Sequence, residues 1–154
     1  MEELAVRIEQ FLEAHHVMSL ATAGESGAHV VSLMYARIGF ALCWMSDPAT
    51  SHSRHLEREP RVSATIAPDY ADFRAIRGLQ IAGRAARIAA ASEADEAREL
   101  LERRYAFLAG IAAGPPQLRE AFDRASFYRL EPERITLIDN SRGFGHKETL
   151  TLAP

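Results

Sequence analysis

The sequence predicts a mainly β protein of the α+β class, a six-stranded antiparallel barrel, closed or split, with flanking helices. Six apolar runs have the length and the bordering turn residues of strands. Several of these runs are separated by only a few residues, which favours antiparallel neighbours. Helical spacing occurs at the N-terminus, in a short segment after the third run, and between the fifth and sixth runs. Because a small barrel fills its interior with side chains, a ligand is expected on its outer wall.

Length and composition limit the class of protein. The 154 residues suit a single domain, 1–154, and 47% hydrophobic with 25% charged residues is ordinary for a globular chain. A net charge of −3 gives no basic excess for nucleic acid, and no apolar run is long enough to cross a bilayer. The single cysteine, Cys43, excludes an internal disulfide and favours a cytoplasmic location.

The first third of the chain is predicted to hold one helix and three strands. Residues 1–13 place Leu4, Ile8, Phe11 and Leu12 on one helical face. Strands are predicted at 17–23, 28–36 and 40–46, joined by turns at 24–27 and 37–39 into a meander. The second and third strands are apolar on both faces. We therefore expect the barrel interior to cover one face, and a partner subunit or a cofactor to cover the other.

A short helix is expected after the third strand, with two alternative starts. Asp47 followed by Pro48 is one N-terminal signal, and a Thr50 or Ser51 cap is the other. Pro60 ends this helix. Further strands are predicted at 61–66, 76–88 and 127–138, a long helix at 92–112, and a short one at 117–125.

Two other features of the second half carry expectations. Gly78 and Gly83 inside the fifth predicted strand indicate a bulge, a bend or the close approach of another backbone. Residues 139–154 are expected to form a flexible tail or a flap.

Phosphate-binding groups gather around the start of the short helix. A phosphate needs converging donors, and a helix N-terminus supplies backbone N–H groups and partial positive charge. The candidate donors are Ser46, Thr50, Ser51, His52 and Arg54. The alternative interpretation is that the hydroxyls are plain caps and the basic residues a solvated face.

Three segments together resemble the pyridoxamine 5′-phosphate oxidase-like, FMN-binding split-barrel superfamily. They are HVVSLMY, WMSDPATSHSRHLEREPRVSATI and IRGLQIAGRAARI. The closing segment RLEPERITLIDNSRGFGHK is similar to that of a small uncharacterised bacterial branch. The resemblance implies a homodimer with FMN held in a groove between two barrels.

The resemblance also implies which residues bind the cofactor. Thr50, Ser51 and His52 fall on a Ser-Arg-Lys phosphate position, so Ser51 replaces Arg and His52 replaces Lys. Arg54 or His55 would compensate for the lost charge. The implied cofactor-binding residues are Val30, Ser32, Leu33, Met34, Ser46, Thr50, Ser51, His52, Arg54 and Gln80.

Near the C-terminus, Arg142, His146 and Lys147 form a basic cluster with two glycines between them. One expectation is a mobile flap, which reaches a partner's flavin site or contacts an anionic substrate. The other is a disordered tail. The resembling oxidases close with an Arg-x-His substrate motif. Because Arg142 and His146 have a different spacing, pyridoxamine 5′-phosphate oxidase activity is not predicted.

The expected function is an FMN-dependent oxidoreductase acting on a small molecule, with NAD(P)H as a candidate electron donor. The flavin performs such chemistry, which agrees with the absence of a nucleophile–base pair or a metal-ligand cluster in the sequence. The catalytic residues stay unassigned and no metal site is predicted. The alternative is a non-catalytic protein of the same fold that binds flavin, deazaflavin or haem, with His29, His52, His55 and His146 as haem ligands.

Overall fold

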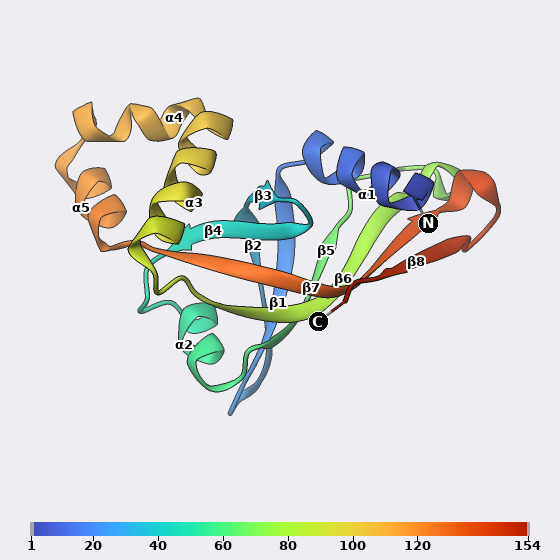
Figure 1. Cartoon of the computed structure of the whole chain (residues 1–154), viewed down its shortest axis with the longest axis horizontal. Helices are drawn as coiled ribbons and strands as arrows, with labels where there is room; N and C mark the ends of the chain where they lie inside the picture. Colours follow the sequence, from blue (N-terminus) through green and yellow to red (C-terminus); the bar gives the residue numbers. More distant parts are fainter. Residues whose placement is uncertain (1, 154) are drawn as a thin grey trace.

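The computed structural model describes residues 2–153, which form one strongly curved antiparallel sheet with helices around it (Figure 1). The strands are β1 (Val17–Gly24), β2 (Gly27–Met34), β3 (Ala36–Ile38), β4 (Ala41–Ser46), β5 (Arg61–Ile66), β6 (Arg77–Arg87), β7 (Ser126–Asp139) and β8 (Lys147–Thr151). Their order is β2-β1-β5-β6-β7-β4-β3, and β8 also pairs with β7. The predicted split barrel is confirmed, with eight strands in the described residues instead of six.

In the described residues, five α-helices and three 3-10 turns lie around the sheet. They are α1 (Glu2–Ala14), α2 (Ser51–Arg58), α3 (Ala91–Arg104), α4 (Ala106–Ala109) and α5 (Pro116–Arg124), with the 3-10 turns η1 (Phe73–Ala75), η2 (Ile111–Ala113) and η3 (Asn140–Arg142). No helix within residues 2–153 is both long and apolar enough to span a bilayer.

The second predicted strand is in fact two strands that bend at Tyr35. β2 pairs with β1, whereas β3 pairs with β4 at the other end of the strand order. The predicted meander is therefore wrong, and residues 37–39, expected as a turn, lie largely in β3. Tyr35 is fully buried, and its hydroxyl donates to the Leu12 carbonyl at 2.8 Å. The Tyr105 hydroxyl donates to the Tyr35 carbonyl, so contacts with distant segments hold the bend.

The barrel interior forms the main core, and α1 closes one end of it. Leu4, Ile8, Phe11 and Leu12 are buried, as their helical spacing predicted. Each such side chain contributes about 1.5–3 kcal/mol when it leaves water. Trp44 on β4 is also fully buried and stacks on Tyr128 with the ring centroids 5.8 Å apart.

The outer face of β4 is covered by the chain's own helix α3. Cys43 packs there in a second buried cluster with Ala97 and Leu101. Burial raises the pKa of the Cys43 thiol to about 11, so this group is a buried apolar side chain rather than a nucleophile. The sequence predicted a partner subunit or a cofactor on this face of β4, and the structure shows α3 there instead.

The glycine in the middle of β6 marks a close approach of two backbones. The β6–β7 register shifts between Ala82 and Gly83. A Cβ atom on Gly83 would lie only 2.3 Å from the Glu131 carbonyl oxygen. The predicted irregularity is confirmed, and its cause is the neighbouring strand at Pro132.

The long predicted helix at 92–112 ends early, because Tyr105 has extended φ and ψ angles of −122° and 95°. Most of its predicted apolar stripe is buried, namely Ala97, Leu101, Tyr105 and Leu108. The side chain of Ala112, the last member of the stripe, lies outside the described part. Residues 147–151, expected as part of a tail or flap, form β8 and pair with β7.

Candidate functional site

Helix α2 begins at Ser51, so the Thr50 cap was the better of the two predicted starts. Thr50 has extended φ and ψ angles of −66° and 154°, and its Oγ1 accepts the backbone N–H of Ser53 at 3.4 Å. Asp47 instead shapes the turn before the helix, where its carboxylate accepts the Ala49 N–H at 2.8 Å. The cap consumes part of the Thr50 hydroxyl's hydrogen-bonding capacity.

His52, predicted at the phosphate, lies on the inner side of α2. Its side chain is only 6% exposed, and Nε2 lies 2.9 Å from Ser46 Oγ and 3.3 Å from Thr50 Oγ1. Burial lowers the pKa of His52, and nearby His29 and His55 lower it further. This imidazole is therefore neutral near pH 7 and serves to fix the corner between β4 and α2. It does not supply the fixed positive charge of a lysine.

His55 holds the β1–β2 hairpin against α2. Its Nδ1 lies 2.8 Å from Thr22 Oγ1, and its ring meets the His29 ring edge-on with centroids 5.6 Å apart. A Cβ on Gly24 would lie 2.3 Å from His55 Nε2, so a larger residue here would require the His55 ring to move. No group of three or more His, Cys, Asp or Glu side chains in residues 2–153 is placed to hold a metal ion.

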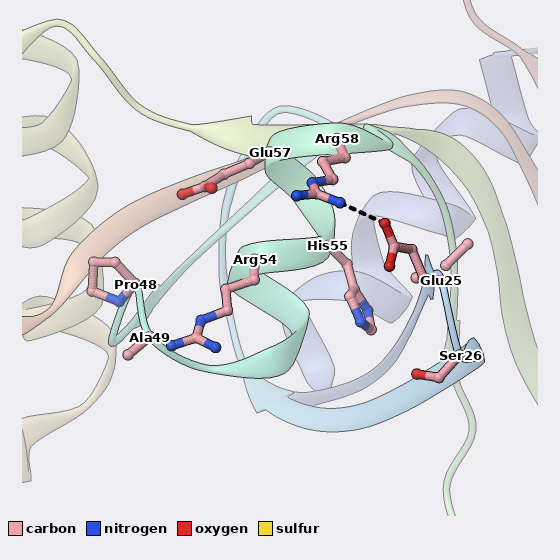
Figure 2. Close-up of a pocket in the computed structure, with 10 residues that line it drawn as sticks. Glu25, Ser26, Pro48, Ala49, Arg54, His55, Glu57 and Arg58 are labelled. Carbon is pink, nitrogen blue, oxygen red and sulfur yellow. Dashed lines mark hydrogen bonds and ion pairs between the residues drawn. The ribbon is translucent and has the colours of Figure 1, made fainter.

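A cavity of about 680 Å³ opens between α2 and the β1–β2 hairpin (Figure 2). Its lining consists of Ala23, Gly24, Glu25, Ser26, Pro48, Ala49, Arg54, His55, Glu57 and Arg58. Arg58 donates to the Glu25 carboxylate at 2.7 Å. The Arg54 side chain points back toward Pro48 and Ala49 in Figure 2, and the described residues offer it no ion pair. The volume is within the range of small-molecule sites.

The outer face of β2 is uncovered in the single chain. Val30 and Met34 are 65% and 41% exposed, and Ser32 between them is also exposed. Leu33, predicted beside them, turns its side chain inward and packs against the core. Because β2 stands at one end of the strand order, one edge of its backbone is not paired with another described strand. That edge offers N–H and C=O groups to a ligand or another chain.

Gln80 lies on the same outer face, but three strands away from β2. The register of the sheet aligns it in a row of small polar side chains, which are Ser32, Ser19, Thr65, Gln80, Thr136 and Thr149. At strand spacing, Gln80 is about 15 Å from Ser32. It also lines a separate hollow of about 380 Å³ with Thr65 and Tyr70. Sequence reasoning missed this row, although polar–apolar alternation in RVSATI signalled part of it.

The predicted basic cluster near the C-terminus is largely neutralised. His146 Nε2 lies 3.0 Å from a Glu148 oxygen, and Arg142 lies 3.6 Å from the same carboxylate. Arg7 donates to Glu148 at 2.6 Å, and these bonds lower the pKa of Glu148 to about 2. Lys147 is exposed on β8. Figure 1 places this C-terminal segment beside α1 and away from α2. Within a single chain it therefore lies far from the β4–α2 corner.

The neutral, buried state of His52 predicts a pH dependence of stability. Its folded-state pKa is below the usual value, so in acid the unfolded chain takes up a proton first. Stability present above about pH 6.5 is therefore lost as the pH falls toward the folded-state pKa. We expect thermal unfolding of His52→Gln to change less between about pH 7.5 and 5.5 than that of the parent. Exposed His16→Gln is the control, and an equal pH response in His52→Gln would contradict the assignment.

The comparisons with known proteins cover most of the chain. A family model described as pyridoxamine 5′-phosphate oxidase matches residues 4–139. A UPF0306 protein of Photorhabdus laumondii subsp. laumondii is 26% identical over 144 residues, covering 91% of this chain and 90% of that one.

Two solved structures are similar in fold. A heme-binding protein from Mycobacterium smegmatis has a TM-score of 0.73 and 22% identity, over 96% of this chain and 57% of that chain. A FAD-binding protein from Mesorhizobium loti has a TM-score of 0.65 and 22% identity, over 85% of this chain and 91% of that chain. The chain thus spans little more than half the length of the mycobacterial protein. At these identities the likeness shows the fold alone.

Proposed function

The chain belongs to the pyridoxamine 5′-phosphate oxidase family, and from that premise we propose that it binds a flavin and oxidises or reduces a small molecule. The flavin is FMN, held at the seam of a homodimer beside the β4–α2 corner. The isoalloxazine carries the electrons, while the protein binds and orients it. NAD(P)H is the proposed electron donor. Oxidation of pyridoxamine phosphate is not proposed, because Glu148 engages both Arg142 and His146.

The open outer face of β2 is the observation that carries this proposal. Val30 and Met34 are apolar and exposed on an edge strand. These side chains flank the exposed Ser32 on the same face, and the unpaired backbone edge adds hydrogen-bonding groups. A flat, partly apolar ring with polar edges matches both properties. Ser51 and Arg54, both exposed at the start of α2, supply donors for the ligand's anionic end.

A second copy of the chain would cover the rest of this face. The row of polar side chains runs over six strands, and Ser32, Thr65, Gln80 and Thr149 in it are exposed. Short side chains allow close approach of a partner, and most homo-oligomers pair through a two-fold axis. The proposed seam therefore places β2 of each chain next to its partner.

A spectrum of the purified protein tests the proposal. We expect flavin absorption, bleaching when NADH or NADPH is added without oxygen, and a solution mass of twice the chain mass. A colourless protein that does not take up FMN would contradict flavin binding. A stable monomer that still binds FMN would contradict the seam only.

The second candidate is a non-catalytic carrier of haem or deazaflavin. The observation that favours it is the lack of a fixed cation at Thr50, Ser51 and His52. Its weakness is the shortage of axial ligands, because His52, His55 and His146 are already hydrogen-bonded within the chain. Adding haem and FMN separately to the purified protein decides between the two candidates. A protein that binds haem and not flavin shows the haem absorption band alone.

A negative charge at the start of α2 should repel the phosphate of FMN. Since a carboxylate in place of the buried His52 would disturb the fold, Ser51→Asp alone is the suitable change. We expect FMN affinity to fall about tenfold or more and riboflavin affinity to stay the same. Fluorescence titration measures both, and Ser92→Asp at the start of α3 is the matched control. Unchanged FMN affinity in Ser51→Asp would remove this corner from the phosphate site.

A further inference from the structure

The corner offers less positive charge than its sequence suggests. Four basic residues lie on α2, namely His52, Arg54, His55 and Arg58, yet His52 turns inward and is only 6% exposed. Its ring nitrogen is already 2.9 Å from Ser46 Oγ. His55 is held by Thr22 at 2.8 Å. His52 therefore does not line the cavity, and His55, which does line it, has one ring nitrogen engaged by Thr22.

The cavity lining itself is balanced in charge. It contains two arginines and two glutamates, so their formal charges sum to zero. Arg58 is paired with Glu25 at 2.7 Å, and Glu57 stands on the same helix as Arg54. Arg54 is therefore the one arginine that the described lining leaves for an anion. It is exposed, so water and salt screen its charge.

A doubly charged phosphate needs more than this. A terminal phosphate monoester carries about −1.5 to −2 charges at pH 7, and strong sites hold it with several fixed donors, commonly a bidentate arginine. One exposed ion pair and one helix N-terminus each strengthen binding by only about fivefold. Together they allow a preference of about thirtyfold at most for a phosphorylated ligand over its dephosphorylated form.

We propose that this site recognises the flavin by its ring and holds the end of the ribityl chain weakly, so that it binds flavins ending in a neutral or singly charged group with an affinity within about thirtyfold of that for FMN. This rests on the proposed flavin function and specifies its ligand class. The exposed apolar face of β2 supplies the affinity for the ring, and Ser51 and Arg54 supply a modest contribution at the tail.

Titration of the cofactor-free full-length chain with riboflavin and with FMN tests the proposal. The expected ratio of the two dissociation constants is below about thirty. A ratio above that value, with FMN bound more tightly, would overturn the proposal and leave the flavin function intact. If neither flavin binds, the proposed function fails, and the proposal fails with it.

A gain of charge gives the matched test. Ser51 is exposed, so Ser51→Arg adds a cation at the start of α2 without entering the core. We expect FMN affinity to rise about fivefold or more and riboflavin affinity to stay constant. Ser92→Arg, at the start of α3 and outside the cavity lining, should change neither. An FMN affinity that does not respond to Ser51→Arg would show that the site already holds its phosphate fully or elsewhere, and the proposal would fall.

Discussion

Gly83→Ala is expected to lower the free energy of unfolding by about 3 kcal/mol or more. The added Cβ would lie 2.3 Å from the Glu131 carbonyl oxygen and 2.9 Å from the Pro132 Cα. Both obstacles are backbone atoms of β7, so no side-chain rotation relieves the clash. Relief requires the two central strands to separate where their register shifts.

Gly110→Ala is the matched control for this change. Gly110 has a helical φ of −85°, and its added Cβ would meet only the Phe107 carbonyl oxygen at 3.5 Å, an ordinary contact. We expect this variant to be neutral or slightly stabilising, because alanine reduces the freedom of the unfolded chain. Urea unfolding of both variants measures the difference. Equal stability of the two would refute the close approach at Gly83.

Val30→Glu is expected to convert the protein to a monomer and to weaken flavin binding by about a hundredfold or more. The side chain is 65% exposed in one chain, so the substitution leaves the barrel core untouched. In the proposed dimer it would place an unpaired charge on each side of a buried seam, which costs several kcal/mol. Light scattering gives the mass, and titration gives the flavin affinity.

Phe107→Glu separates this effect from a general response to surface charge. Phe107 is 58% exposed on α4, away from the outer face of β2. The control should remain dimeric with unchanged flavin affinity. If only Phe107→Glu dissociates, the dimer interface lies at helices α3 to α5 and not at β2. If Val30→Glu stays dimeric with full flavin affinity, β2 is not part of the site.

Elements defined by local signals were predicted well. The strand 61–66 has the predicted bounds, because alternating side chains and a preceding proline mark it without reference to other segments. The α2 start at Thr50 and the buried face of α1 follow from capping and from helical spacing in the same way.

Elements that depend on distant partners were not predicted. The bend at Tyr35 requires the Leu12 carbonyl, on α1, and the Tyr105 hydroxyl, at the junction of α3 and α4, both far from it in the sequence. The inward turn of His52 depends on Ser46 at the end of β4. The separation of Gln80 from β2 depends on a strand order that places β1 and β5 between them.

The sequence by itself determined the class of fold, the buried face of α1 and the start of α2, because periodicity and capping act over a few residues. Only the tertiary structure decided which polar groups at the start of α2 face outward. Whether a histidine is a buried neutral hydrogen-bonding group or a surface cation depends on what packs against it, and here the β4–α2 corner turns His52 inward and leaves Ser51 and Arg54 exposed.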